Sequence, residues 1–81
     1  MAPSSTVELV RYLVTSLVEH GDDVRIEKRE SEAGASYEVT VHPDDTGKVI
    51  GRQGRVIKAI RVLVRAAASA DGSDATVEVV G

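Results

Sequence analysis

Two glycines three residues apart, between two stretches of helical periodicity, constrain this chain more than any other feature of its sequence. Gly51 and Gly54 bracket the dipeptide Arg52–Gln53. Glycine has no Cβ, so it adopts positive φ angles readily and lets a second backbone approach closely. We therefore expect a tight loop that joins a short helix, beginning at about residue 46, to a long helix over residues 55–70.

The start of that long helix makes the loop suited to bind phosphate. The first N–H groups of a helix have no partners within the helix and carry partial positive charge, which favours an anion. Lys48, Arg52 and Arg55 add full positive charges beside the turn. The segment therefore indicates a clamp for a phosphodiester backbone, with little room for aromatic stacking.

The distribution of charge points to the same segment. The chain has a net charge of −3, yet residues 46–70 contain no Asp or Glu and hold six of the ten basic residues. This window carries +6 and the rest of the chain −9. A local basic patch of this kind can bind a polyanion while the acidic remainder limits nonspecific contacts. A solvated basic helix face is the alternative interpretation, and charge alone does not decide between the two.

Composition and motifs exclude several classes of function. The chain has only two aromatic residues and no cysteine, which argues against base-stacking RRM and OB modules, disulfide frameworks and thiolate zinc sites. Its two histidines lie far apart in sequence, so we expect no metal site and no cofactor. No P-loop is present, because Val49 follows Lys48, and no catalytic triad is recognisable. We expect a protein that is not an enzyme and has no catalytic residues.

The N-terminal region and the hydropathy of the chain give no sign of export or of a membrane partner. No basic segment followed by an apolar run marks a signal peptide, and no apolar stretch approaches membrane-spanning length. We therefore expect a soluble cytoplasmic protein. Residues 1–4 are expected to be disordered, and residues 5–81 to form a single domain.

The remaining periodicities predict a small α+β domain. Apolar residues at helical spacing predict a first helix over residues 6–19, and alternating residues predict strands over 24–30, 37–42 and 76–80. The first two strands are expected to form a hairpin. Two helices separate the second strand from the third, which is long enough for a crossover and parallel pairing. We expect the order α-β-β-α-α-β and a three-stranded mixed sheet covered on one face by three helices.

The segment from Val49 to Ile60 resembles the signature of KH domains, Ile/Val-Ile-Gly-x-x-Gly-x-x-Ile, at every motif position. Such a GXXG loop clamps about four nucleotides of single-stranded backbone. The order of elements is similar to the type II arrangement of bacterial KH domains. A stand-alone domain of this length resembles the bacterial KhpA family of small RNA-binding proteins.

The resemblance implies a partner and a set of binding residues. It implies single-stranded RNA binding, with work as an RNA chaperone or in post-transcriptional regulation. It also implies a homodimer or a pairing with the larger protein KhpB (Jag), a pair that in some bacteria is tied to cell elongation, and so to cell shape. The expected RNA contacts are Gly51, Arg52, Gln53, Gly54, Lys48, Arg55 and Lys58. The residues expected to line or support the groove for the bases are Val49, Ile50, Ile57, Ile60 and Val41.

The long helix has more apolar surface than one core contact needs. At about 100° per residue, its basic residues Arg55, Lys58, Arg61 and Arg65 fall together on one side. A core stripe is expected from Val56, Ile57, Ile60, Leu63, Val64 and Ala67. Beside it, an edge remains that we expect to mediate self-association, made by Ala59, Val62, Leu63 and Ala66. Scattered apolar surface residues are the alternative.

Two alternative functions stay open at this level. The domain could serve mainly as a protein-assembly subunit, or it could bind single-stranded DNA with the same clamp. Phosphate contacts make nucleic-acid binding strongly salt-dependent, whereas apolar assembly is not. The contacts to the 2′-OH that distinguish RNA from DNA are not visible in a sequence.

Overall fold

The computed structural model describes residues 5–80, so the disorder predicted for residues 1–4 concerns residues outside the described range. The helices and strands follow in the predicted order α-β-β-α-α-β. They are α1 (Thr6–Leu17), β1 (Arg25–Ser31), β2 (Gly34–Thr40), α2 (Thr46–Ile50), α3 (Arg55–Ala70) and β3 (Ala75–Val80). Short 3₁₀ turns occupy Gly21–Asp23, Pro43–Asp45 and Arg52–Gly54.

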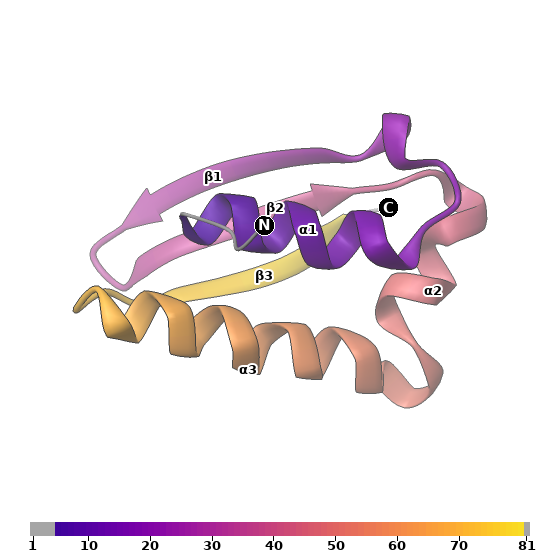
Figure 1. The fold of residues 1–81 in the computed structure, drawn as a ribbon. Coiled ribbons are helices and arrows are strands. Elements are labelled where there is room, and N and C mark those ends of the chain that lie inside the picture. The colour runs from indigo at the N-terminus through magenta and orange to yellow at the C-terminus, as the bar shows by residue number, and fades with distance from the viewer. Residues whose placement is uncertain (1–4, 81) are drawn as a thin grey trace.

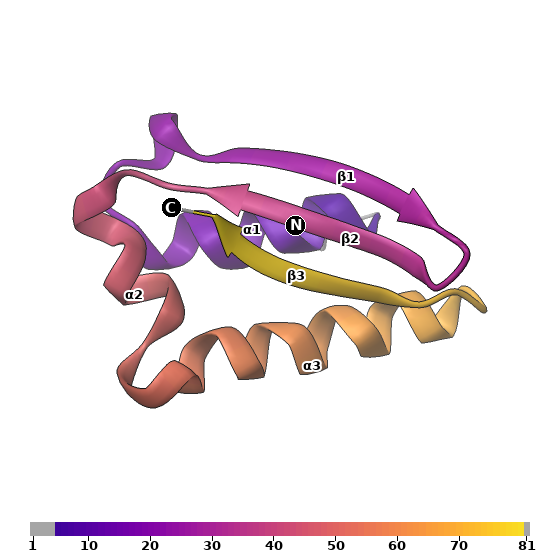
Figure 2. The same ribbon diagram turned by 180° about the vertical axis from the view of Figure 1, so that it is seen from behind.

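The strands form one sheet in the order β1-β2-β3, as predicted. The hairpin strands β1 and β2 are antiparallel, with Ile26 opposite Val39, and β3 pairs parallel to β2, with Val77 beside Tyr37. Figures 1 and 2 show the helices on one face of this sheet and the other face uncovered. The predicted α+β architecture is confirmed.

The core lies between the sheet and the helices and is almost entirely aliphatic. Side chains of a strand alternate between its two faces, so β2 buries Tyr37 and Val39 while Thr40 is exposed. The buried apolar residues are Val10, Val14, Val24, Tyr37, Val39, Val41, Val49, Ile57, Ile60, Val64, Ala68, Ala75 and Val77. No helix within residues 5–80 has both the length and the hydropathy needed to cross a membrane.

Helix α1 begins as predicted and ends earlier than predicted. The Ser5 hydroxyl oxygen accepts a hydrogen bond from the Glu8 N–H at 3.3 Å, which caps the first turn. The last helical residue is Leu17 rather than Glu19, and Val18 is extended. The N–H groups of Glu19 and His20 donate to the side chain of Asp45 instead of continuing the helix. A tertiary contact therefore sets this helix end.

The hairpin is tighter than the sequence predicted. Strand β2 starts at Gly34 instead of residue 37, and it ends at Thr40, so Val41 is buried beyond the strand. The Ala35 N–H donates to the Asp74 carbonyl at 2.9 Å. A Cβ on Gly34 would lie 2.6 Å from that oxygen, so the strand extends to a position that only glycine can occupy.

Helix α3 has the predicted bounds, but its buried face is rotated slightly from the predicted stripe. Leu63, which was expected in the core, is 51% exposed, whereas Ala68 is 1% exposed. The buried residues centre on Ile57, Ile60 and Val64, and Leu63 lies at the margin of this sector. The prediction for Leu63 as a core residue is therefore wrong.

Candidate nucleic-acid interface

The loop between α2 and α3 is a single turn built from left-handed backbone conformations. Gly51 has φ 76° and ψ 171°, Gln53 has φ 60°, and Gly54 has φ 73°. The Gly51 N–H donates to the Gly47 carbonyl at 2.8 Å, and the Gly54 N–H donates to the Gly51 carbonyl at 3.1 Å. The loop lies at one corner of the molecule, at the opposite end from the β1–β2 hairpin turn (Figure 1).

The two glycines of the loop are required for different reasons. A Cβ on Gly51 would lie 2.4 Å from Val56 Cγ2 and 2.9 Å from the Val56 backbone nitrogen, so this glycine lets the loop close against α3. A Cβ on Gly54 would have no atom nearer than Ile57 Cγ2, at 3.9 Å. Glycine is therefore favoured at residue 54 because of its positive φ and not because of a close contact. The space beside it at the start of α3 is open.

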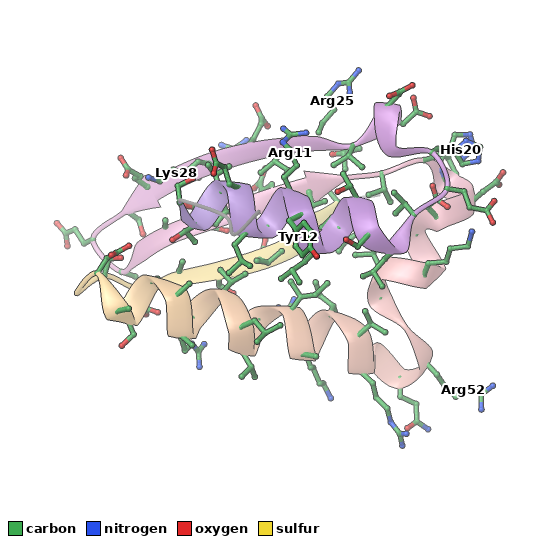
Figure 3. All side chains as sticks on the ribbon, in the orientation of Figure 1. Arg11, Tyr12, His20, Arg25, Lys28 and Arg52 are labelled. Atoms are coloured by element: carbon green, nitrogen blue, oxygen red, sulfur yellow. The ribbon has the colours of Figure 1, made fainter. Side chains whose placement is uncertain are left out.

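The N-terminus of α3 carries no side-chain cap. Its N-cap is Gly54, and within residues 5–80 no side chain accepts a hydrogen bond there. Arg52 points away from the body of the molecule (Figure 3). Arg55 is exposed, and its Nη2 lies 3.4 Å from Gln53 Oε1. The N–H groups of Gly54 and Arg55 already donate to the carbonyls of Gly51 and Arg52. The positive end of the α3 dipole and two guanidinium groups therefore meet at one exposed corner, an arrangement suited to an anion.

The basic residues of this corner are not neutralised by carboxylates. Among the described residues, no Asp or Glu oxygen lies within 4.0 Å of the cationic nitrogens of Arg52, Arg55 or Lys58. Farther along α3, Arg61 Nε donates to the Val77 carbonyl of β3 at 2.8 Å. This contact holds Arg61 against the free edge of the sheet, a position that its place in the sequence does not reveal.

Lys48 differs from the other predicted cationic RNA contacts because it is already paired with carboxylates. Its Nζ lies 3.2 Å from Glu19 Oε1 and 3.3 Å from Asp45 Oδ1. The hydrogen bond to Glu19 raises the pKa of Lys48 above its ordinary value, with a further contribution from Asp45. Lys48 is thus charged, but two carboxylates already share that charge.

Asp45 anchors the segment that leads to the loop. It is completely buried and accepts hydrogen bonds from the Glu19 N–H at 3.2 Å and the His20 N–H at 2.9 Å. Burial alone would raise the pKa of this carboxyl, but the hydrogen bonds from His20, Glu19 and Lys48 together lower it. The sequence indicated only a helix-start residue, because these backbone partners lie 25 and 26 residues away.

The apolar residues of the motif support the loop from inside. Val49 exposes no surface, and Ile57, Ile60 and Val41 are 6%, 3% and 6% exposed. Ile50 is half-buried and is the member of this set with the most access to solvent. By contrast, the four residues expected to mediate self-association are all exposed on α3, and Val62 is 67% exposed.

The uncovered face of the sheet carries a row of three glutamates. Glu27, Glu38 and Glu78 lie side by side on the three strands, and Glu38 alternates with the buried Tyr37 and Val39. Arg29 Nε lies 2.9 Å from Glu38 Oε2 and compensates part of this charge. Arg25 lies on the same face, so three carboxylates stand there against two guanidinium groups. The unpaired cations of the loop and α3 therefore favour a polyanion more than the open sheet does.

The two histidines lie together in the structure. The expectation of no metal site rested on their separation in the sequence, and that reason does not hold. The ring centroids of His20 and His42 are 4.1 Å apart and stacked. Distance along the chain therefore gave no guide to their distance in space.

Comparisons with known proteins agree with this geometry. A family model described as the KH domain of KhpA/KhpB matches residues 7–79. The "RNA-binding protein KhpA" of Leifsonia xyli subsp. xyli is 45% identical over 80 residues, which cover 99% of this chain and 96% of that protein. The protein of the same name from Halalkalibacterium halodurans is 49% identical over 61 residues, or 75% of this chain and 80% of that protein.

A solved structure shares the fold. The crystal structure of Aquifex aeolicus Era bound to GDP·AlF4⁻ aligns with a TM-score of 0.62 and 22% identity. The alignment covers 91% of this chain and 29% of that chain, so it concerns the fold alone. With a family model that spans nearly the whole domain and relatives of nearly the same length, the chain belongs to the KhpA/KhpB family of KH domains.

Proposed function

We propose that this protein binds single-stranded RNA and that its glycine loop clamps the RNA backbone. The observation that carries the proposal is the uncapped start of α3 beside Arg52 and Arg55, neither of which is paired with a carboxylate among residues 5–80. The names of its relatives, RNA-binding protein KhpA, support RNA as the ligand.

The proposed contacts follow from the geometry of the corner. A phosphate lies at the positive end of the α3 dipole, outside the first turn of the helix, with Arg52 and Arg55 on either side. Lys58 lies one turn farther along α3 and receives the next phosphate. Gly51 and Gln53 shape the turn, and Lys48 contributes a charge that is already shared with Glu19 and Asp45.

The cellular role proposed is that of an RNA chaperone or post-transcriptional regulator in the cytoplasm, without catalytic activity. One domain with one clamp has a short footprint, so a second clamp on the same strand would raise avidity through effective concentration. That second clamp is proposed to come from another copy of the chain or from KhpB (Jag). Single-stranded DNA offers the same phosphates, and competition between RNA and DNA strands of equal sequence separates the two ligands.

Reversing charge on the loop is expected to abolish tight RNA binding. Arg52→Asp/Gln53→Asp removes a cation and places two carboxylates at the proposed phosphate site, so affinity for a labelled single-stranded RNA pool falls by about 100-fold or more. Fluorescence anisotropy measures the loss. The remaining binding of the variant should also show a shallower salt dependence, by about one unit of slope for each lost phosphate contact.

The matched control carries the same change of charge elsewhere. Arg11→Asp/Ser16→Asp alters exposed positions on α1 and changes the net charge by the same amount. It should retain RNA binding within a fewfold of wild type. If the two double variants lose affinity equally, only the net charge matters and the loop is not the clamp.

A second candidate function is protein assembly, which the exposed apolar residues of α3 favour. Val62 and Leu63 are 67% and 51% exposed, and Ala59 and Ala66 beside them would let a second helix approach closely. We expect wild-type protein to be dimeric and Leu63→Glu to be monomeric with unchanged circular dichroism, as measured by analytical ultracentrifugation. Ser16→Glu on α1 serves as control. A monomeric wild type, or a dimeric Leu63→Glu variant, would remove this proposal.

A further inference from the structure

Two histidines and an aspartate from separate parts of the sequence meet at one end of the molecule. His20 and Asp23 belong to the turn between α1 and β1, and His42 follows β2. One potential ligand atom from each of the three lies within 4.8 Å of the other two. Figure 3 shows His20 at the end of the molecule where α1 finishes, on the outside.

One buried residue fixes the backbones of both histidines. The Asp45 carboxylate accepts the His20 N–H at 2.9 Å, and the Asp45 N–H donates to the His42 carbonyl at 2.8 Å. Asp45 itself is fully buried. The two imidazole rings are therefore presented to each other by a rigid part of the fold, while the exposed side chains of His20 and Asp23 can turn at little cost.

The donor set suits a transition metal. Two imidazole nitrogens and one carboxylate oxygen are ligands that Zn²⁺ takes at about 2.0–2.2 Å, with water in the fourth position. Ca²⁺ and Mg²⁺ require oxygen ligands throughout, so this set disfavours them. Ligand atoms around one zinc ion lie roughly 3–4 Å apart by that geometry. The two rings are stacked with 23° between their planes, so the exposed His20 side chain must rotate out of the stack before both imidazoles can ligate one ion.

The surroundings of His42 offer a partner for its second nitrogen. His42 Nδ1 accepts the Asp44 N–H at 3.0 Å, so a neutral ring in this hydrogen bond carries its proton on Nε2. Metal ligation through Nε2 therefore requires this hydrogen bond to break. Ligation through Nε2 puts the ring proton on Nδ1, and Asp44 Oδ2 lies 3.7 Å from that atom. This separation is longer than a hydrogen bond, and rotation of the exposed Asp44 side chain would close it to the usual outer-shell arrangement, in which a carboxylate accepts the proton of a ligating imidazole. Asp44 is exposed, so water can replace its lost N–H bond.

We propose that His20, His42 and Asp23 form a binding site for Zn²⁺ or a similar transition-metal ion. The ion links the turn that follows α1 to the segment that precedes α2, the same two segments that Asp45 joins from inside. The site is separate from the glycine loop and does not depend on RNA binding. Its predicted effect is to stabilise the folded chain by mass action, by an amount that rises with the logarithm of the free metal concentration once that concentration exceeds the Kd.

Calorimetric titration of the untagged full chain with zinc chloride tests the site. We expect one equivalent of zinc to bind, and binding to weaken about tenfold or more in each of the variants His20→Asn, His42→Asn and Asp23→Asn. Asparagine at residue 42 can still cap Asp44, so folding is expected to persist. Asp22→Asn, in the same turn, removes the same charge and should bind like wild type.

Two further readouts make the result unambiguous. The imidazole ¹⁵N resonances of both histidines should shift on addition of zinc, and zinc should raise the Tm of wild type but not of His42→Asn. Absence of saturable binding to wild type overturns the proposal. So does equal affinity in either histidine variant, or an equal loss in Asp22→Asn and Asp23→Asn, which would show that the carboxylate of Asp23 is not a ligand.

Discussion

Replacing Gly51 with alanine is expected to lower the free energy of unfolding by about 2–6 kcal/mol. The φ of 76° and ψ of 171° lie in a region that is essentially restricted to glycine. The added Cβ would also overlap Val56, including its backbone nitrogen at 2.9 Å, which cannot rotate away. Both costs fall on the junction of α2 and α3.

The other glycines of this region provide graded controls. Gly54→Ala keeps the unfavourable φ but meets no atom closer than 3.9 Å, so about 1–2 kcal/mol is expected. Gly47 lies in α2 with nothing within 4 Å of a new Cβ, so Gly47→Ala should stabilise by ~0.5–1 kcal/mol. Urea unfolding followed by circular dichroism gives the three values. Equal stability of Gly51→Ala and Gly47→Ala would contradict the loop geometry.

Replacing Asp45 with alanine is expected to lower the Tm by ~10 °C or more. The change leaves the N–H groups of Glu19 and His20, whose hydrogen bonds are partly buried, without their acceptor and takes one carboxylate from Lys48. Asp45→Asn keeps one acceptor oxygen, so its Tm should fall less than that of Asp45→Ala. Asp44→Asn, at the adjacent exposed position, is the control and should change the Tm little. An equal effect of the changes at residues 44 and 45 would contradict the anchoring role.

The same residue predicts a pH dependence of stability. The folded-state pKa of Asp45 is lower than its ordinary value, so the unfolded chain binds a proton more readily at this group. Its contribution is therefore complete above an unfolded pKa of about 3.9 and is lost as the pH falls through the lower folded pKa. Wild type should lose stability below about pH 4 more steeply than Asp45→Asn. Parallel curves of stability against pH for wild type and Asp45→Asn would contradict this prediction.

The features that the sequence predicted are those encoded by neighbouring residues. The spacing of Gly51 and Gly54 predicted the loop, and the periodicity of residues 55–70 predicted α3 with its observed bounds. The sheet order followed from a hairpin and a crossover of two helices, both of which are readable from the lengths of the segments. Local patterns were therefore sufficient for the fold and for the centre of the proposed site.

The features that the sequence did not predict depend on distant partners. The carboxylate of Asp45 meets backbone groups 25 and 26 residues away, and Arg61 bonds a carbonyl 16 residues away. Every residue carries such backbone groups, so no side-chain pattern marks them. The stacking of His20 on His42 likewise arises only once α1 and β2 finish at the same end of the sheet.

The most direct test of the central claim is to map RNA contacts onto the backbone by ¹H–¹⁵N correlation spectroscopy during titration with a short single-stranded RNA. The account predicts that the largest shifts occur in the amides of residues 51–58, with small shifts at Glu38 and Glu78 on the open sheet face. Shifts concentrated on the sheet or on α1, with the loop amides unchanged at saturation, would contradict it.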